Sequence, residues 1–474
     1  MKRSIKTLVI IASATITSCS TIKQAGLPNG VQIPKEFTPT TDTAANPFAI
    51  KDFFADATLQ RLIDTALASN YDLKVAVQRI EIARANTRIA EAARLPVVNA
   101  VIGAAVDRYG QYTMNGVGNF DTNKSPNINK KQRIPTPTPD YFLGFRSTWE
   151  VDIWGKLKDR RRAAYTRYLA SEKGRQWLAT QIVSEVAGRY YELLALDNQL
   201  RIIARNIDLQ KRGLEIVEAQ MAGGRATALA VRQFKAQVLN TQGAEIDIRQ
   251  SVQRTENELN NLLGRFPAPV ARDTSIIAKV VPQQIGAGIP SEVLLRRPDV
   301  QQAELELIAA KADIDAARKA FLPSLNFNPY VGLNAFKAPL LLSTGSIAAG
   351  LASSLAAPVI NRRGIMNGVN IANAEQATAF YNYQKNIVQG YQEVLTQLQS
   401  IENLKKAYHL KVEEVETLTE GVATANDLYL AGYASYLEVI VAQGSVLQAE
   451  MQQTNIKREI FTSIINLYRA LGGG

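Results

Sequence analysis

The sequence predicts a mainly α-helical protein that also carries membrane β-strands and is built from two similar halves. The first observation is an internal repeat, in which residues 72–96 reappear as residues 299–323. A repeat of roughly 200 residues is far longer than a solenoid unit, so it indicates a duplicated half-molecule. The second observation is that none of the 18 prolines lies within 140–266 or 359–474. Because proline breaks helix interiors, long helices can run through both gaps.

The N-terminus has the composition of a secretion signal. Basic residues at its start precede a short apolar stretch over residues 8–16, which is too short to cross a bilayer as a helix. Ile-Thr-Ser then precedes Cys19, as in a bacterial lipoprotein processing box. We expect 1–18 to be a signal peptide, Cys19 to carry a covalent lipid, and 19–58 to be an acylated N-terminal segment. The alternative is an incidental cysteine in a discarded signal peptide.

The first repeat is predicted to span residues 59–264. A short helix is expected over 59–95, and a long helix over 157–222, where apolar residues recur three and four positions apart. Gly223 and Gly224 end the long helix, and a further helix follows over 229–263. Helices this long are expected to pack side by side as a coiled-coil layer.

Between the short and the long helix, the pattern changes to that of strands. Residues 141–154 alternate strictly between large apolar side chains and a polar or charged set. A half-buried soluble sheet and a membrane barrel with a wet lumen both fit this pattern. The partner strand is expected over 97–109, and 114–140 is expected to be the loop at the hairpin tip.

The second half copies this arrangement after a linker over 265–297. The second repeat, 298–474, is predicted to contain a short helix over 299–322, a long helix that stops at Gly432, and a last helix over 437–471. Its strands are expected over 325–336 and 347–360. Each chain therefore offers four strands, too few to close a barrel. In a membrane the open edges would require oligomerisation, and a trimer would supply twelve strands.

Composition and motifs argue against nucleic-acid binding and against catalysis. The net charge is +11, but the basic residues are spread along the whole chain without a nucleic-acid-binding motif. The one histidine, His409, is expected on a helix surface among lysines. No nucleophile elbow, phosphate loop or multi-cysteine metal spacing is present in the sequence. We therefore expect no enzyme, no metal and no cofactor apart from the lipid on Cys19.

Two segments carry a resemblance to a known family. Ile-Pro-Ser-Glu-Val-Leu-Leu-Arg-Arg-Pro-Asp-Val over 289–300, and Trp-Glu-Val-Asp-Ile-Trp-Gly-Lys over 149–156, resemble signatures of the outer-membrane factor family, the TolC-like ducts, and in particular its acylated branch. The resemblance implies a homotrimer in the bacterial outer membrane. It further implies a twelve-stranded barrel that continues into a long periplasmic helical tunnel. Segments 38–58 and 265–297, with the C-terminus, would form a belt around the tunnel.

The resemblance also gives the two helix-connecting turns a role. They would be periplasmic tips that dock a periplasmic adaptor, which in turn joins the duct to an inner-membrane pump, expected to be proton-driven. The predicted docking residues are Gly223, Gly224, Arg225, Ala226 and Thr227 in the first turn, and Gly432, Tyr433, Ala434 and Ser435 in the second. The alternative is that the glycines only cap helices.

The same family narrows its periplasmic opening with acidic rings and a tyrosine. The matching positions here are Tyr429, Glu438 and Val441, which we predict to form the gate. Val441 departs from the usual aspartate, so a single acidic ring at Glu438 is expected, and the alternative is that Glu438 is a solvated helix residue. Ala230, at the corresponding position of the first half, has no side chain able to make a polar link in the gate.

The predicted function is therefore the passive exit duct of a tripartite efflux system for small molecules or drugs. Two alternatives remain open. One is an exit duct for type I protein secretion, and the other is a lipid-anchored periplasmic coiled-coil scaffold without a pore.

Overall fold

The structure is a computed structural model that describes residues 26–37, 56–272, 276–281, 290–358, 360 and 362–473. The predicted signal peptide over 1–18, Cys19 and most of the predicted acylated segment lie outside the described residues. Parts of the predicted linker over 265–297 lie outside them as well.

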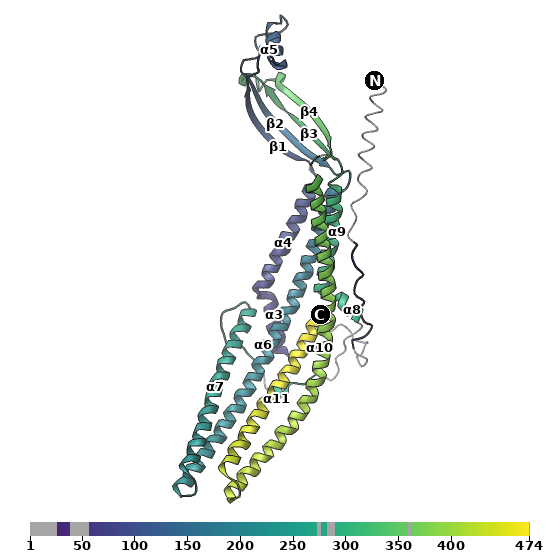
Figure 1. Ribbon diagram of the computed structural model, residues 1–474. Coiled ribbons are helices and arrows are strands. Elements are labelled where there is room, and N and C mark those ends of the chain that lie inside the picture. The colour runs from purple at the N-terminus through teal and green to yellow at the C-terminus, as the bar shows by residue number, and fades with distance from the viewer. Residues whose placement is uncertain are drawn as a thin grey trace. The chain divides into compact units, whose positions relative to one another are not determined.

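The described elements follow the predicted order in both halves (Figure 1). The first half contains α3 (Ala57–Ser69), α4 (Tyr71–Ala92), β1 (Val97–Asp107), α5 (Met114–Lys124), β2 (Thr138–Val151), α6 (Lys156–Ala222) and α7 (Ala228–Leu262). The linker contains η2 (Ile276–Ala278) and α8 (Pro290–Arg296). The second half contains α9 (Pro298–Lys319), β3 (Ser324–Ala335), η3 (Ala338–Leu340), η4 (Thr344–Ser346), β4 (Ile347–Ala356), α10 (Arg362–Ala431) and α11 (Tyr436–Ala470).

The internal repeat is reproduced in the lengths of the helices. α4 and α9 each have 22 residues, and α7 and α11 each have 35. The long helices α6 and α10 have 67 and 70 residues. At 1.5 Å per residue each is about 100 Å long. Among the described residues, no helix is both long enough and apolar enough to cross a membrane.

Two predicted elements differ from the structure. The helix expected over 59–95 is two helices, because the side chain of Asn70 accepts hydrogen bonds from the backbone N–H groups of Asp72 (2.8 Å) and Leu73 (3.1 Å) and so starts a new helix. The hairpin tip expected to be a loop over 114–140 contains α5, which begins where the Thr113 side chain accepts from the Gly116 N–H at 3.1 Å.

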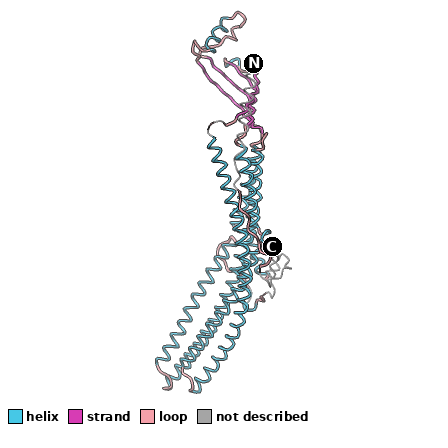
Figure 2. Tube along the Cα trace, turned by 45° about the vertical axis from the view of Figure 1, so that its right-hand side comes forward, coloured by secondary structure: helices cyan, strands magenta, loops and turns pink. Residues whose placement is uncertain are grey.

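The chain divides into two compact units. One contains Ile82–Tyr168 and Glu306–Ala379 and includes a single sheet, whose strands are magenta in Figure 2. The sheet is antiparallel, with the strand order β1-β2-β3-β4. The four predicted strands are therefore confirmed as one sheet, with β2 and β3 in its middle.

The other unit is helical and contains Pro28–Glu81, Leu169–Leu305 and Phe380–Gly474 within the described ranges. Its main core is formed by apolar side chains from α3, α6, α7, α10 and α11. The stacked rings of Tyr191 in α6 and Phe461 in α11, 4.3 Å apart, lie in this core. Burial of these faces fixes how the helices of this unit pack.

Candidate functional site

One face of the sheet is apolar and open to the surroundings. Directly opposed residues in the strand register share a face, so the alternating apolar positions of all four strands lie together. In the chain Ile102 is 85% exposed and Leu351 is 68% exposed. A broad exposed apolar band is the lipid-facing signature of membrane strands. Its large members are Val98, Ile102, Val106, Leu143, Phe145, Trp149, Phe327, Val331, Leu333, Ile347, Leu351 and Leu355.

The opposite face carries mostly polar side chains. The prediction that residues 141–154 alternate strictly is wrong at one position on this face. Phe142 lies on this face and is only 5% exposed. Its ring covers the paired glycines Gly144 and Gly332, where an added Cβ would lie 2.4 Å and 2.6 Å from backbone oxygens of the neighbouring strand. The guanidinium of Arg146 lies over the same ring at 4.5 Å. Two glycines thus make room for one aromatic ring on a polar surface.

The outer strands of the sheet have open edges. Among the described strands, β1 pairs only with β2 and β4 pairs only with β3. Each edge therefore presents backbone N–H and C=O groups without a strand partner from the described part of this chain. In hydrocarbon such groups cost several kcal/mol each, so the edges need partner strands.

The first predicted tip is the turn between α6 and α7. Gly224 adopts a positive φ of 70°, and the Arg225 N–H donates to the Gln220 carbonyl at 2.8 Å, which ends α6. The side chain of Thr227 accepts from the Ala230 N–H at 3.2 Å and starts α7. Gly224 and Thr227 therefore both cap helices. Gly223, Gly224 and Arg225 remain exposed.

The second predicted tip, between α10 and α11, repeats this geometry. Gly432 has a φ of 83°, and the Tyr433 N–H donates to the Leu428 carbonyl at 2.9 Å. Tyr433 is 85% exposed, so its ring projects from the turn. Ala434 is half-buried, and Ser435 is the N-cap of α11. The two turns present the same backbone shape with different side chains, Arg225 in one and Tyr433 in the other.

Tyr429 joins the two helix pairs beside the tips. Its hydroxyl donates to the Gln220 side-chain oxygen, so it links α10 to α6. The ring packs against a small cluster whose buried members are Val217, Ala230 and Phe234. Burial raises the pKa of Tyr429, which keeps the phenol protonated as a donor. Ala230 contributes a methyl group to this cluster and is 1% exposed.

Glu438 and Val441 lie on the first turns of α11. The carboxylate of Glu438 accepts hydrogen bonds from the N–H of Ser435 and, at 3.0 Å, from the Ser435 hydroxyl. This is a capping box, in which the acid stabilises the helix start. Glu438 is exposed, and Val441 is 58% exposed on the next turn. The acid therefore has a structural role that its spacing from Ser435 already encodes.

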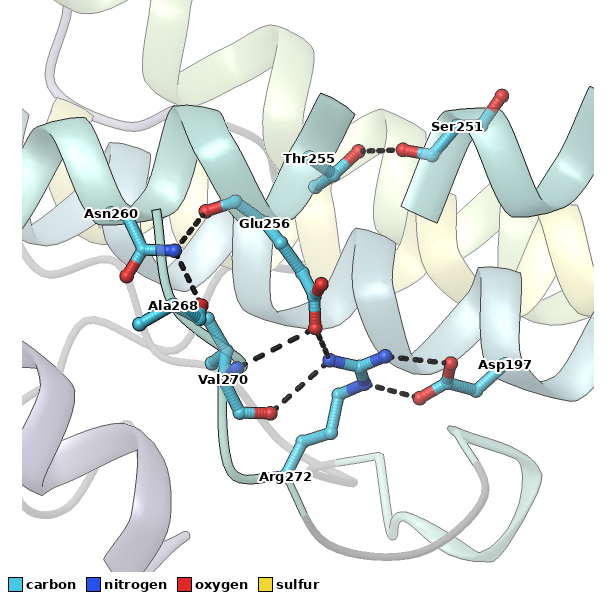
Figure 3. Close-up of polar contacts among 8 residues, drawn as sticks. All are labelled: Asp197, Ser251, Thr255, Glu256, Asn260, Ala268, Val270 and Arg272. Atoms are coloured by element: carbon cyan, nitrogen blue, oxygen red, sulfur yellow. Dashed lines mark hydrogen bonds and ion pairs between the residues drawn. The ribbon is translucent and has the colours of Figure 1, made fainter. Parts of the chain in front are cut away.

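Sequence reasoning missed two arginine clusters in the helical unit. In Figure 3, Arg272 lies between the carboxylates of Asp197 in α6 and Glu256 in α7. The hydrogen bond to Asp197 raises the pKa of Arg272 above its ordinary value, and the bond to Glu256 adds to this. Close by, the Asn260 amide donates to the Ala268 carbonyl at 2.7 Å. These contacts fix the segment after α7 against the helices.

The second cluster surrounds Arg297, which lies in the signature segment 289–300 and is 1% exposed. Its guanidinium donates to Asp299 (2.8 Å), to Glu393 (3.0 Å) and to the Ala470 carbonyl (2.7 Å). It also lies 5.1 Å from the ring of Trp177. Burial lowers the pKa of Arg297, but the two carboxylates outweigh it and the pKa is raised. The signature arginine thus ties the linker to the end of α11.

The described residues include no group of three or more His, Cys, Asp or Glu side chains able to hold a metal ion. The side chain of His409 is 78% exposed and lies 3.1 Å from Glu413, one helical turn away. This agrees with the prediction that it is a surface residue.

Comparisons with known proteins agree with this geometry. The family described as outer membrane efflux protein matches residues 62–265 and 289–473. The probable outer membrane lipoprotein SilC of Salmonella typhimurium is 29% identical over 425 residues, covering 90% of this chain and 87% of that protein. The pyoverdine export outer membrane protein OpmQ of Pseudomonas putida is 31% identical over 421 residues, covering 89% and 87%. The crystal structure of a membrane protein from Pseudomonas aeruginosa superposes with a TM-score of 0.84 at 25% identity, covering 96% of this chain and 98% of that one.

Proposed function

Because this chain belongs to the outer membrane efflux protein family, we propose that it is the exit duct of a tripartite efflux system. It is an outer-membrane channel, and it conducts small molecules passively from an inner-membrane pump and a periplasmic adaptor to the outside. The pump supplies the energy, so the duct itself performs no catalysis and uses no cofactor other than its lipid.

The observation that carries this proposal is the open four-stranded sheet with one exposed apolar face. Such a sheet is unstable in water because of its apolar face, and unstable in lipid because of its free edges. Pairing β4 of one copy with β1 of the next removes the free edges, and the hydrocarbon of the membrane then covers the apolar face. Three copies would supply twelve strands, four from each, and enclose a lumen lined by the polar face.

The tip turns are proposed to dock the adaptor. Small exposed residues around Gly224 and Gly432 allow another helix hairpin to approach the backbone closely. The exposed ring of Tyr433 adds an aromatic contact of the kind that dominates protein interfaces. The pump that the adaptor recruits is proposed to be proton-driven.

The region of Tyr429, Glu438 and Val441 is proposed to be the periplasmic gate. In a trimer, each residue would occur three times around one axis. The hydrogen bond between Tyr429 and Gln220 holds α10 and α6 together in the described conformation. Adaptor binding would shift the helices toward an open state by binding that state more tightly. A ring of three Glu438 carboxylates would favour cations.

Cys19 is proposed to carry the lipid that anchors the mature N-terminus in the outer membrane. The lipoprotein relative described above supports this assignment. The Pseudomonas putida relative is named for pyoverdine export, which favours small-molecule cargo over type I protein secretion. A scaffold without a pore has no use for a sheet with an exposed apolar face, so this alternative is set aside.

The function is tested by planar-bilayer recording on the purified full-length protein, with the oligomer mass measured in detergent. We expect a trimer that forms long-lived, cation-preferring pores. A monomer or dimer without conductance would contradict the duct and the barrel together.

A matched pair of variants tests which face of the sheet meets lipid. Ile102→Arg places a charge on the apolar face, whereas Val101→Arg places the same charge on the opposite face of the same strand. Arginine near the middle of a bilayer costs about 2–4 kcal/mol on the lipid face of a barrel. We therefore expect Ile102→Arg to reduce the amount of membrane-inserted trimer severely and Val101→Arg to alter only conductance. Equal loss in both variants would contradict the assigned orientation.

A further inference from the structure

A cavity lies in the sheet-containing unit where β2 ends and α6 begins. Its volume is about 660 Å³, within the range of sites that hold small ligands. Basic and aromatic side chains dominate its wall. Those used below are Trp154, Lys158, Arg161, Arg162, Tyr165 and Lys319.

Both acidic side chains of the wall are already engaged. Asp152 accepts hydrogen bonds from the N–H groups of Leu157 (3.0 Å) and Lys158 (2.7 Å), so it caps α6. Asp159 is paired with Lys319 at 2.5 Å. The attraction of the helix start for anions is therefore satisfied by Asp152, and any further anion must be held by side chains.

The basic side chains exceed the acids that could neutralise them. Arg161 forms an ion pair at 3.3 Å with Glu91, which does not line the cavity. The buried Nε of Arg161 has no hydrogen-bond partner. Lys158 and Arg162 are exposed, and neither forms an ion pair with any carboxylate in the described part of the chain. Four basic side chains against two acidic ones leave the wall with a net charge of +2.

Aromatic side chains lie next to these basic side chains at the end of the sheet. The indole N–H of Trp149 donates to the Arg94 carbonyl at 2.9 Å, and that of Trp154 donates to the Pro323 carbonyl at 2.7 Å. Both indoles remain partly exposed, at 36% and 46%. Tryptophan with a satisfied N–H and an open apolar ring is typical of the boundary between hydrocarbon and headgroups. Tyr165, 48% exposed, continues this surface into the cavity.

We propose that this cavity binds the phosphate headgroup of an anionic phospholipid in the periplasmic leaflet of the outer membrane. The inference rests on the proposed function, in which the sheet crosses that membrane and α6 runs into the periplasm. Lys158 and Arg162 hold the phosphate, while Trp154 and Tyr165 contact the glycerol and the first acyl carbons. A free anion would use the cations but not the exposed rings, which is why a lipid fits better.

The test measures binding of dioleoylphosphatidylglycerol and of dioleoylphosphatidylcholine to the detergent-solubilised full-length protein, by native mass spectrometry. Each basic side chain near an anionic lipid surface contributes about fivefold in affinity. We therefore expect Lys158→Gln with Arg162→Gln to weaken phosphatidylglycerol binding about 25-fold. The control variant is Arg160→Gln with Arg363→Gln, which removes the same charge from two exposed residues that do not line the cavity. We expect this control to change phosphatidylglycerol binding less than twofold.

Three results would overturn the proposal. The first is unchanged phosphatidylglycerol binding in the cavity variant. The second is competition by millimolar inorganic phosphate, which would identify a site for free anions. The last is the absence of a preference for phosphatidylglycerol over phosphatidylcholine in the wild-type protein. A changed reversal potential of the pore together with unchanged lipid binding would place the cavity on the path of the cargo instead. Planar-bilayer recording on the same preparations separates a failure of the proposed function from a failure of the lipid site. Wild-type protein that forms no pores contradicts the duct, whereas protein that forms pores but shows no lipid preference contradicts only the lipid site.

Discussion

Replacing Tyr429 by phenylalanine removes a single hydroxyl that links α10 to α6. The ring stays in its apolar cluster, so the substitution abolishes only the hydrogen bond to Gln220. A hydrogen bond of this kind contributes about 1 kcal/mol net. If the gate helices of three subunits move together, the closed state is destabilised by about 3 kcal/mol, a shift of roughly 140-fold toward the open state. If they move independently, the shift is about fivefold per subunit.

Open probability in single-channel recordings measures this shift directly. Tyr436→Phe is the matched control, because Tyr436 packs against the same cluster and no hydrogen bond of its hydroxyl is found within the described ranges. We expect Tyr429→Phe to raise open probability and the uptake of large antibiotics by intact cells, and Tyr436→Phe to leave both unchanged. Burial raises the pKa of Tyr429, so the difference between variant and wild type is expected to be constant from pH 6 to pH 8, about two units below the ordinary tyrosine value.

A double-mutant cycle with Gln220→Met assigns the effect to this hydrogen bond. If the hydroxyl acts through Gln220, the double variant behaves like either single variant. Fully additive effects, or an open probability for Tyr429→Phe equal to that of Tyr436→Phe, would refute the argument that this bond holds the gate.

Three further predictions concern the helical unit. Arg297→Met leaves two carboxylates without their cation, and we expect the free energy of unfolding to fall by about 2–4 kcal/mol. The loss is smaller than for a fully buried pair because Glu393 is 38% exposed. Thermal unfolding followed by circular dichroism measures the loss, and an unchanged Tm would contradict the role of this cluster. For Asp56, burial raises the pKa, but hydrogen bonds led by that from Lys279 outweigh it and lower the pKa below 3.8. The stabilisation relative to Asp56→Asn is therefore present above about pH 4 and disappears as pH falls through the folded-state pKa, which a series of Tm values between pH 2 and pH 7 tests. Gly432→Ala is expected to strain the second tip by about 1 kcal/mol, since its φ is 83°, and to reduce drug resistance in a complementation assay. Gly243→Ala, in α7 and outside both tips, is expected to be tolerated because an added Cβ there meets nothing within 4 Å.

The long elements of this fold could be predicted because their signals are local. Prolines are absent where α6 and α10 run, apolar residues recur at helical spacing, and glycines stand at both tips, where a positive φ is required. The sheet followed from the alternation in one strand, from the partner that such a strand needs and from the internal repeat. The break at Asn70 was missed because one polar residue with helix-forming neighbours on both sides is a weak signal. Its capping geometry depends also on the Leu262 carbonyl, to which its amide donates at 2.9 Å.

The candidate site was predictable as positions, but not as contacts. Spacing alone places Ser435 and Glu438 three residues apart, which is the signal for a capping box. The partner of Tyr429 is Gln220, more than 200 residues away along the chain, and no periodic pattern points to it. Arg272 and its two carboxylates show the same limit, since Asp197 and Glu256 belong to different helices.

The sequence by itself determined the two-fold repeat, the four strands with one apolar face, the long helices and the positions of both tips. These features depend on periodicity and on the backbone preferences of proline and glycine, which act within a few residues. Only the tertiary structure decided which polar side chains meet: Tyr429 with Gln220, Arg297 with Glu393, and Lys319 with Asp159 beside the basic cavity. Such pairs depend on the register between helices, and that register is set by the packing of whole apolar faces.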